Sequence, residues 1–300
     1  MTNKEAEWDS LFKDIKLTKI PFPSKLSVEY LDVIKKYLPK RARILEAGSG
    51  SGEISAYLAQ NGYDTYLLDK SEAAINLSKR LFKKFDLKGN FIQGNLFKIP
   101  FSENYFDCVW NSGVLEHFSD EAVVKALKEM ARVSNNLVIS LVPNAQSVIY
   151  RLAKLKNERV GTWLYGQESP KYTQSNYFKQ AGLYLLEERT IGKYFGIMWL
   201  KELTKIPKKT LSELTYWVEE FREEKLLDSI SYLLLTIGTK KGGAAAKKGI
   251  QTHHLKEKEN EISKLNEIII TQRRKINSLE KFANEVRSSR FWKIYRLIKK

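Results

Sequence analysis

Short apolar segments alternate with longer segments of helical periodicity as far as about residue 240. From Val28 to Leu38 the apolar positions recur at spacings of three and four, which predicts a helix closed by Pro39. The expected strands are the apolar runs at Ile44–Leu45, 63–68, 90–93, 106–110, 136–142, 182–189 and 230–239. The expected helices between these strands are residues 54–61, 73–85, 120–133 and 211–227.

This alternation predicts an α/β fold. Strands joined by helices form right-handed crossovers, and their near-continuous apolar character indicates burial on both faces of the sheet. We therefore expect a doubly wound, mostly parallel sheet within residues 1–240, with the helix at 27–38 covering one face. Residues 143–177 have no clean period and are rich in aromatic rings, so we interpret them as an insertion between sheet elements.

Three further parts are expected after this domain. Residues 241–252 combine lysine, glycine and alanine without a packing pattern, which predicts a linker. Within 253–289 apolar residues recur every seven positions, with Lys258 and Gln272 as polar exceptions, which predicts a coiled coil. One helix cannot bury such a narrow stripe alone, so we expect a homo-oligomer or a partner's coil.

The last part, residues 290–300, alternates bulky apolar side chains with arginine and lysine. This pattern is typical of a helix that lies in a membrane surface, so we expect peripheral membrane contact through this tail. The alternative is a solvated basic end whose aromatic rings cap the coiled coil.

Charge and composition indicate the kind of partner and the cellular compartment. Of the formal charge of +16, +9 falls in residues 244–300, which indicates an anionic partner or serves solubility. The mixed-charge start predicts no signal peptide, and no apolar run is long enough to span a bilayer. The single cysteine, Cys108, fits a reducing compartment. We expect a cytoplasmic protein, peripheral at the inner membrane face where the tail inserts.

Candidate chemistry centres on a turn in which a short apolar run reaches Glu46 and then Gly48, Gly50 and Gly52. Glycines permit positive φ angles and a close approach of the backbone to a ligand, and the next helix directs its N–H groups at that ligand. The spacing departs from the dinucleotide fingerprint, and Glu46 suits a cationic group such as an ammonium better than a phosphate. A nucleoside-bearing ligand is therefore expected, with an ordinary glycine-rich turn as the alternative.

The turn resembles motif I of the class I S-adenosylmethionine-dependent methyltransferases, Glu-x-Gly-x-Gly-x-Gly. Val114–His117 resembles the Val-Leu-Glu-His turn of the same family. The resemblance covers residues 1–240 and implies a seven-stranded Rossmann-like sheet with a hairpin-like edge, S-adenosylmethionine as cofactor and methyl transfer as the reaction. A methyltransferase domain followed by a coiled coil and a basic tail resembles enzymes that modify cell-surface polysaccharides or lipid-linked glycans.

The resemblance also assigns roles to single residues. Asp69, at the end of the second strand, is expected beside the ribose hydroxyls, although it could instead cap a helix. Asn95 stands where the family usually has an aspartate at the adenine amino group, and an amide oxygen can accept that hydrogen bond. Leu96 would pack against the adenine. Asn111 and its backbone should face the methionine part of the cofactor.

His117 follows the fourth strand and is the candidate base that takes a proton from a hydroxyl group; alternatively it orients the loop. Asn111 is not followed by the Pro-Pro-aromatic loop of the family's nucleic-acid-base methylases, so nucleic acid is not favoured. His253 and His254 have no partners at ligand spacing, so no metal site is expected.

We therefore hypothesise O-methylation of a sugar of a cell-surface or lipid-linked glycan, or of a related small molecule. Two alternatives stay open at this point. One is an RNA-modifying enzyme that uses the basic tail on phosphates, and the other is a non-catalytic scaffold that retains the fold.

Overall fold

The computed structural model describes residues 3–220, 223–240 and 273–274. The chain divides into two compact units, residues 1–247 and 248–300, and every element named below belongs to the first. The predicted linker and tail lie outside the described residues, as does the predicted coiled coil apart from the helical Arg273 and Arg274.

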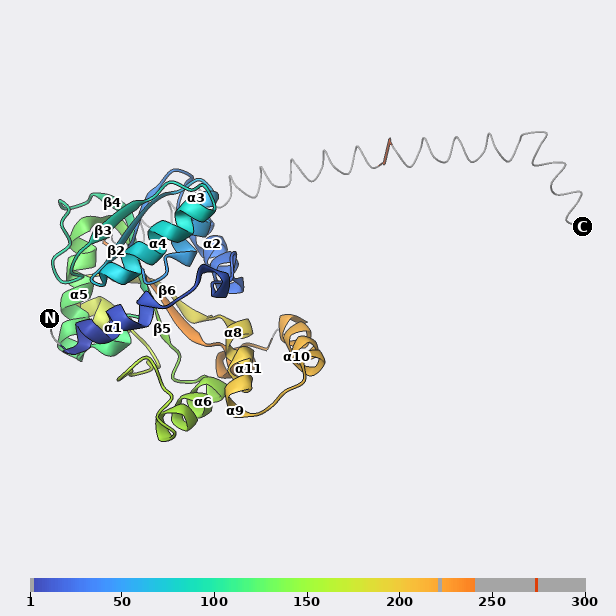
Figure 1. Ribbon diagram of the computed structural model, residues 1–300. Coiled ribbons are helices and arrows are strands. Elements are labelled where there is room, and N and C mark those ends of the chain that lie inside the picture. Colours follow the sequence, from blue (N-terminus) through green and yellow to red (C-terminus); the bar gives the residue numbers. More distant parts are fainter. Residues whose placement is uncertain (1–2, 221–222, 241–272, 275–300) are drawn as a thin grey trace, which may run out of the picture. The chain divides into compact units, whose positions relative to one another are not determined.

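A seven-stranded sheet forms the centre of the first unit (Figure 1), in the order β3-β2-β1-β4-β5-β7-β6. The first five strands are parallel, and β7 pairs antiparallel with both β5 and β6. The predicted doubly wound sheet with a hairpin-like edge is confirmed. The strands are β1 (Arg43–Ala47), β2 (Asp64–Asp69), β3 (Asn90–Gln93), β4 (Phe106–Ser112), β5 (Ser134–Pro143), β6 (Tyr184–Ile191) and β7 (Leu233–Thr239).

Helices cover both faces of the sheet, as the apolar strands require. Successive residues of a strand face opposite sides, so Leu67 packs in one core with residues of α3 and α4, and Leu68 packs in another with residues of α5. On the α3 side, Tyr30 of α2 packs on Trp110 of β4 with ring centroids 4.5 Å apart. These helices are α2 (Lys25–Tyr37), α3 (Glu53–Gln60), α4 (Glu72–Lys84), α5 (Asp120–Val133) and α7 (Ser175–Gln180).

The remaining helices lie toward the carboxyl ends of the strands. The helix α1 (Asn3–Lys13) runs alongside α4 (Figure 1). A separate small core joins α6 (Val148–Arg159), α8 (Lys193–Met198), α10 (Lys208–Glu220) and α11 (Glu224–Ile230). The short α9 (Leu200–Leu203) and the 3-10 turns η1 (Leu17–Lys19) and η2 (Leu115–His117) complete the described elements.

The structure adds detail to two predictions about residues beyond β5. The segment 143–177, interpreted as an insertion between sheet elements, lies between β5 and β6 and contains the twelve-residue helix α6. Apolar side chains of α6 lie on its buried and on its exposed side, so no single-face period appears in the sequence. The helix expected at 211–227 is two helices, α10 and α11. Among the residues described, no helix is long and apolar enough to cross a bilayer.

Candidate active site

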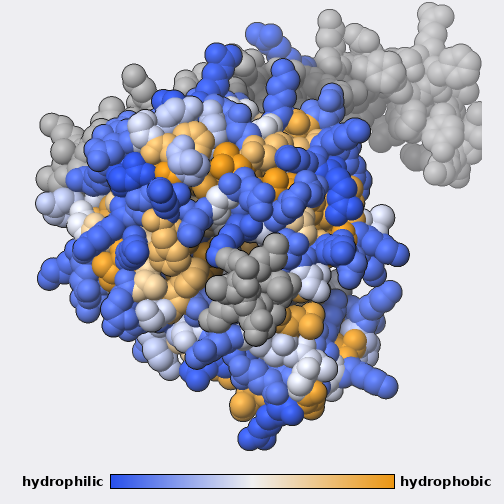
Figure 2. Space-filling view, turned by 60° about the vertical axis from the view of Figure 1, so that its left-hand side comes forward, coloured by the Kyte–Doolittle hydropathy of each residue, from blue (hydrophilic) through white to orange (hydrophobic). Residues whose placement is uncertain are grey.

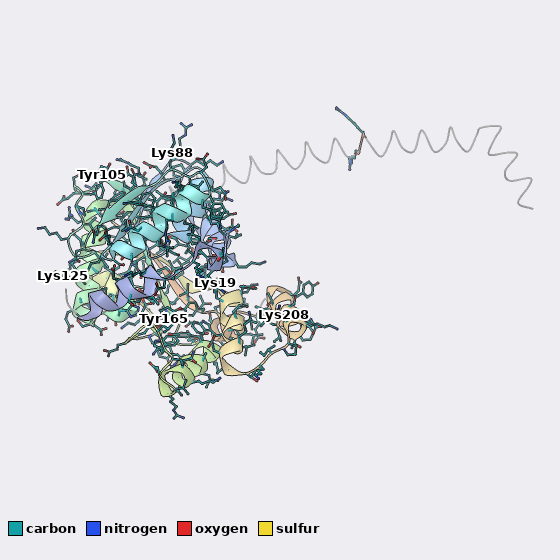
Figure 3. All side chains as sticks on the ribbon, in the orientation of Figure 1. Lys19, Lys88, Tyr105, Lys125, Tyr165 and Lys208 are labelled. Atoms are coloured by element: carbon teal, nitrogen blue, oxygen red, sulfur yellow. The ribbon has the colours of Figure 1, made fainter. Side chains whose placement is uncertain are left out.

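A cavity of about 680 Å³ opens at the carboxyl ends of β1 to β4. The carboxyl edge of such a sheet is where doubly wound folds bind their ligands. Five segments form its wall, and α1 contributes the side that faces away from the sheet, between the labels of Lys125 and Lys19 in Figure 3. The wall consists of Trp8, Asp9, Phe12, Gly48, Leu68–Glu72, Gln93–Phe97, Gly113, Val114, His117 and Phe118.

The glycine turn is closely packed against its surroundings. Gly48 lines the cavity with φ at +86°, and a Cβ atom there would lie 2.6 Å from Val114 Cγ2. Gly52 has φ at +68°, and its Cβ would lie 2.5 Å from Leu67 Cδ2. Gly50 faces the ring of Phe12 on α1. Gly48 therefore shapes the cavity wall, whereas Gly50 and Gly52 allow α1 and β2 to approach the turn.

Asp69 lines the cavity at the end of β2, and its carboxylate ties the turn to β2. Its Oδ2 atom accepts a hydrogen bond from the Gly50 N–H at 2.8 Å, and Oδ1 accepts one from the Ser71 N–H at 2.9 Å. Burial raises the pKa of Asp69, and the backbone hydrogen bonds oppose this rise. The remaining lone pairs of both oxygens can accept further hydrogen bonds, which suits a pair of ribose hydroxyls.

Glu46 and Asn111 lie behind the cavity wall. Glu46 is 5% exposed and accepts a hydrogen bond from Ser55 Oγ of α3 at 2.6 Å, and burial raises its pKa well above the usual value. The fully buried Asn111 contacts Met130 Sδ through Nδ2, and its Oδ1 accepts a hydrogen bond from Ser140 Oγ. Any direct contact of Asn111 with a ligand in the cavity would therefore come from its backbone.

The end of the cavity near β3 combines apolar side chains with the two amides of Gln93 and Asn95. Asn95 Oδ1 accepts a hydrogen bond from the Phe97 N–H at 2.9 Å, which leaves a second lone pair for a ligand. Leu96 is buried, and the Phe97 ring meets the Phe118 ring with centroids 5.1 Å apart. This combination of flat apolar surface and a few polar groups suits a purine ring.

The contribution of α1 was missed in the sequence, although Trp8 and Phe12 stand four residues apart on one helical face. Between them, Asp9 Oδ1 accepts hydrogen bonds from Ser71 Oγ at 2.7 Å and from the Ala73 N–H at 3.1 Å. The hydrogen bond from Ser71 lowers the pKa of Asp9. Asp9 thus attaches α1 to the N-terminal turn of α4, where a negative charge is favourable.

His117 lines the cavity on the side opposite β3. Its Nδ1 atom lies 2.8 Å from the carbonyl oxygen of Gln167. Because a carbonyl only accepts hydrogen bonds, Nδ1 carries the proton of the neutral ring and Nε2 carries the lone pair. Nε2 lies 3.9 Å from Glu116 Oε1, and the Trp8 ring meets the imidazole edge-on at 5.2 Å. His117 thus lines the cavity and has its Nε2 atom on the side of Glu116, where this tautomer could act as a general base.

Next to His117 is a group of buried rings and carboxyls, here called the Glu116 cluster: Glu116, Tyr150, Trp163, Glu168 and Tyr232. The Tyr150 hydroxyl donates a hydrogen bond to Glu168 Oε1, and the Tyr150 ring lies 5.0 Å from that of Tyr232. Burial raises the pKa of both carboxyls. Glu116 Oε2 and Trp163 Nε1 are buried without a hydrogen-bond partner among the described residues.

Such unpartnered buried atoms are costly, so a polar ligand that pairs with them would stabilise the site. The Glu116 cluster is adjacent to the cavity, because a Cβ atom added to Gly113 in the cavity wall would lie 3.6 Å from Glu116 Oε1. Ser49, beside Gly48 in the glycine turn, likewise has a buried hydroxyl without a partner among the described residues. Both sides of the site therefore retain hydrogen-bonding capacity for ligands.

Solved structures with the same fold include two that align over most of this chain. The first, solved in work on the conversion of a disulfide bond into a thioacetal group during echinomycin biosynthesis, has a TM-score of 0.54 and 14% identity. It aligns with 84% of this chain and 99% of its own. The second is the [4+2]-cyclase SpnF, with a TM-score of 0.50 and 15% identity over 72% of this chain and 81% of its own. These likenesses concern the fold alone.

Sequence comparison is more specific. The family described as "Methyltransferase domain" matches residues 45–136. An uncharacterized methyltransferase of Schizosaccharomyces pombe is 34% identical over 113 residues, which are 33% of this chain and 38% of that protein. The ubiquinone/menaquinone biosynthesis C-methyltransferase UbiE of Vibrio cholerae is 32% identical over 97 residues, 30% of this chain and 36% of that protein. The chain thus spans well under half the length of these relatives.

Proposed function

We propose that this chain, which carries a class I S-adenosylmethionine-dependent methyltransferase domain, transfers the methyl group of S-adenosylmethionine to a hydroxyl group of a sugar-containing acceptor. The observation that supports this most directly is the position of His117 between two sites. On one side is the cavity with Asp69 and Gly48, and on the other is the Glu116 cluster with its unpartnered polar atoms.

The cavity has the features that the donor requires. Asp69 has lone pairs for the ribose hydroxyls, Asn95 and Leu96 suit the adenine, and Gly48 lets Val114 pack against the turn in the cavity wall. When bound, S-adenosylmethionine supplies an already activated methyl group. The protein's own task is to align the acceptor, exclude water and remove a proton.

His117 would carry out the proton transfer. Its Nδ1–H donates to the Gln167 carbonyl, which fixes the tautomer and the orientation of the ring. Nε2 would then accept the proton of the acceptor hydroxyl as that oxygen becomes methylated. The rings of Trp8 and Phe12 on the outer side of the cavity would keep water away from the reacting atoms.

Two features of the Glu116 cluster support a sugar as the acceptor. Aromatic rings pack against the apolar faces of a pyranose, and Tyr150, Trp163 and Tyr232 supply such rings. Carboxyls accept hydrogen bonds from several hydroxyls, and Glu116 and Glu168 supply both. The basic, aromatic segment predicted at 290–300 supports an acceptor at a membrane, such as a lipid-linked glycan.

C-methylation is the second candidate, because relatives such as the UbiE proteins are named C-methyltransferases. A base at His117 would serve equally well for removing a phenolic proton before attack by a ring carbon. The aromatic rings of the Glu116 cluster suit a flat aromatic acceptor as well as a sugar. The two candidates therefore differ in the acceptor rather than in the donor side.

The experiment that tests the proposal uses the full chain and a donor labelled in its methyl group. Label would be followed into separated lipid-linked glycans, quinone precursors, RNA and soluble metabolites. We expect incorporation into the glycan fraction, released as an O-methyl sugar on acid hydrolysis. Label in a quinone precursor would instead support C-methylation. Label in RNA alone, or donor binding without any transfer, would contradict the proposal, and the cyclase with this fold makes the last outcome a necessary control.

A further inference from the structure

The helix α6 presents an apolar stripe on the outside of the molecule. Val148, Leu152 and Leu155, at positions i, i+4 and i+7 of the helix, have side chains that are 55%, 50% and 48% exposed. Residues at this spacing lie on one face of a helix. The opposite face is also apolar, since Tyr150 and Ala153 are fully buried. The core of the molecule therefore accounts for the buried face of α6 and leaves the outer stripe without a role in folding.

The exposed apolar surface continues beyond the helix. Val160 and Leu164 are 61% and 71% exposed, and Tyr172, which is 64% exposed, accepts a hydrogen bond from Arg151 Nη1 of α6. Figure 2 shows small hydrophobic areas among hydrophilic ones at the lower edge of the molecule, the height at which Figure 1 places α6 and α9. We call Val148, Leu152, Leu155, Val160, Leu164 and Tyr172 together the α6 surface. The three aliphatic side chains that share the exposed face of α6 indicate an interaction site, and the other apolar residues are near it in the sequence.

Cations surround the α6 surface. Arg151, Lys156 and Arg159 are exposed on α6, between and beside the apolar positions. The only acidic residue of the helix, Glu158, forms an ion pair with Lys154, so it does not offset the charge of the other three. Lys156 also donates a hydrogen bond to the carbonyl oxygen of Leu203, which fixes α9 beside the helix.

This combination identifies the chemistry of the partner. Aliphatic side chains that project from a convex helix, with cations beside them and a tyrosine at the margin, match the boundary between anionic headgroups and acyl chains. Tyrosine is favoured at that boundary because its ring is apolar and its hydroxyl is polar. A protein groove would have to be both apolar and acidic to match the same surface.

We propose that the α6 surface lies in the headgroup region of an anionic membrane and attaches the methyltransferase domain to it. The buried face of the same helix carries Tyr150 of the Glu116 cluster. A helix is about 10 Å across, so attachment would place this cluster about one helix diameter from the lipid. The inference is independent of methyl transfer, because attachment to lipid can be measured without turnover.

The test is flotation of the full chain with vesicles of phosphatidylcholine alone and of phosphatidylcholine mixed with the anionic lipid phosphatidylglycerol. The variant is Leu152→Glu/Leu155→Glu, which places two charges in the α6 surface. The matched control is Tyr184→Glu/Leu185→Glu, which changes two side chains on the edge strand β6 that are 54% and 42% exposed. Far-ultraviolet circular dichroism and donor binding verify that both variants are folded.

We expect the wild-type chain to float with the anionic vesicles, the control to follow it, and the α6 variant to bind at least about tenfold more weakly. A second pair of variants tests the charge: Arg159→Glu should weaken binding, and Lys88→Glu, far from α6 in Figure 3, should not. The proposal is overturned if the α6 variant binds as the wild type does, which would assign attachment to another segment such as residues 290–300. Stable capture of a protein or of a second copy on the wild-type α6 surface, without lipid binding, would overturn it equally.

Discussion

The proposed donor side and the proposed acceptor side of this site are built in different ways. The donor side, mostly residues 43–118, follows from a short motif whose glycines permit a turn that other residues would obstruct. The proposed acceptor side joins Glu116 to rings and helices of residues 143–232, which no motif marks in the sequence. Proteins of one fold can share a donor and differ in their acceptor, so a motif can identify the first region and not the second.

The change with the largest expected effect lies where the two regions meet. His117→Ala removes the candidate base and leaves the glycine turn and Asp69 in place. We expect the rate of transfer to fall by roughly a hundredfold to ten-thousandfold, the usual contribution of general base catalysis, while donor affinity changes by less than about twofold. Single-turnover rates and calorimetry with S-adenosylmethionine measure the two quantities separately. Equal turnover of the variant and the wild type would remove His117 from the base role.

The second prediction concerns the donor side alone. In Gly48→Ala the new Cβ would meet Val114 Cγ2 at 2.6 Å, and the β-branched Val114 has little freedom to move. Overpacking of this kind costs about 1–3 kcal/mol of folding stability. Because the displaced Val114 side chain lines the cavity, donor affinity should also fall, by roughly tenfold or more. Gly62→Ala is the matched control, because Gly62 has a similar φ of +89° but open space around its Cβ position.

Calorimetry and urea unfolding compare these two glycine variants. Gly62→Ala should lose about 1–2 kcal/mol of folding stability to the unfavourable φ. Gly48→Ala should lose this and about 1–3 kcal/mol more to overpacking, and only Gly48→Ala should lose donor affinity. The same affinity for both variants would mean that conformational strain, rather than the packing of the cavity wall, sets the requirement for glycine at position 48.

The contrast between the two regions also explains which parts of the structure could be predicted from the sequence. The elements from α2 to β5 were predicted to within a few residues. Their helices bury one face and show a clear helical period, and their strands are buried on both faces and form apolar runs. The placement of Gly48, Asp69, Asn95, Leu96 and His117 around one cavity likewise followed from the order of strand ends. The helix α6 was not predicted, because apolar residues on both its exposed and its buried face leave no clear helical period in the sequence.

Other features depend on which way a side chain points. Neighbouring residues of β1 face opposite sides of the sheet, and Leu45 and Ala47 belong to the core on the α5 side. Glu46 therefore points to the α3 side, where it meets Ser55 instead of the cavity. The sequence identifies a carboxylate at a strand end, but only the tertiary structure shows which neighbour it meets. The same holds for Trp8 and Phe12, whose place over the cavity depends on the contact of Asp9 with α4.

The smallest expected effect is a change in the pH dependence of folding stability when Glu46, which lies behind the cavity wall, is replaced. Burial raises the pKa of Glu46 in the folded chain well above its value of 4.5 in the unfolded chain, so the folded state favours the neutral carboxyl. Its contribution to stability is then complete below pH 4.5 and is lost as the pH rises through the folded-state pKa. In Glu46→Gln the side chain stays neutral at every pH and keeps an acceptor for the Ser55 hydroxyl.

The free energy of unfolding should therefore depend less on pH in Glu46→Gln than in the wild type. Urea unfolding between pH 5 and pH 8 measures the free energy of unfolding of the two proteins. The contributions of the other buried carboxyls are the same in both and cancel in the difference. As the pH rises, the free energy of unfolding of Glu46→Gln should increase relative to that of the wild type. If the two free energies change in parallel with pH, Glu46 has no part in the pH dependence. Donor affinity measured on the same samples tests the contact with the donor's ammonium group that the sequence predicts. If Glu46 carried a charge that held the ammonium group, its removal would weaken donor binding. Unchanged affinity would therefore mean that Glu46 only supports the glycine turn, through Ser55.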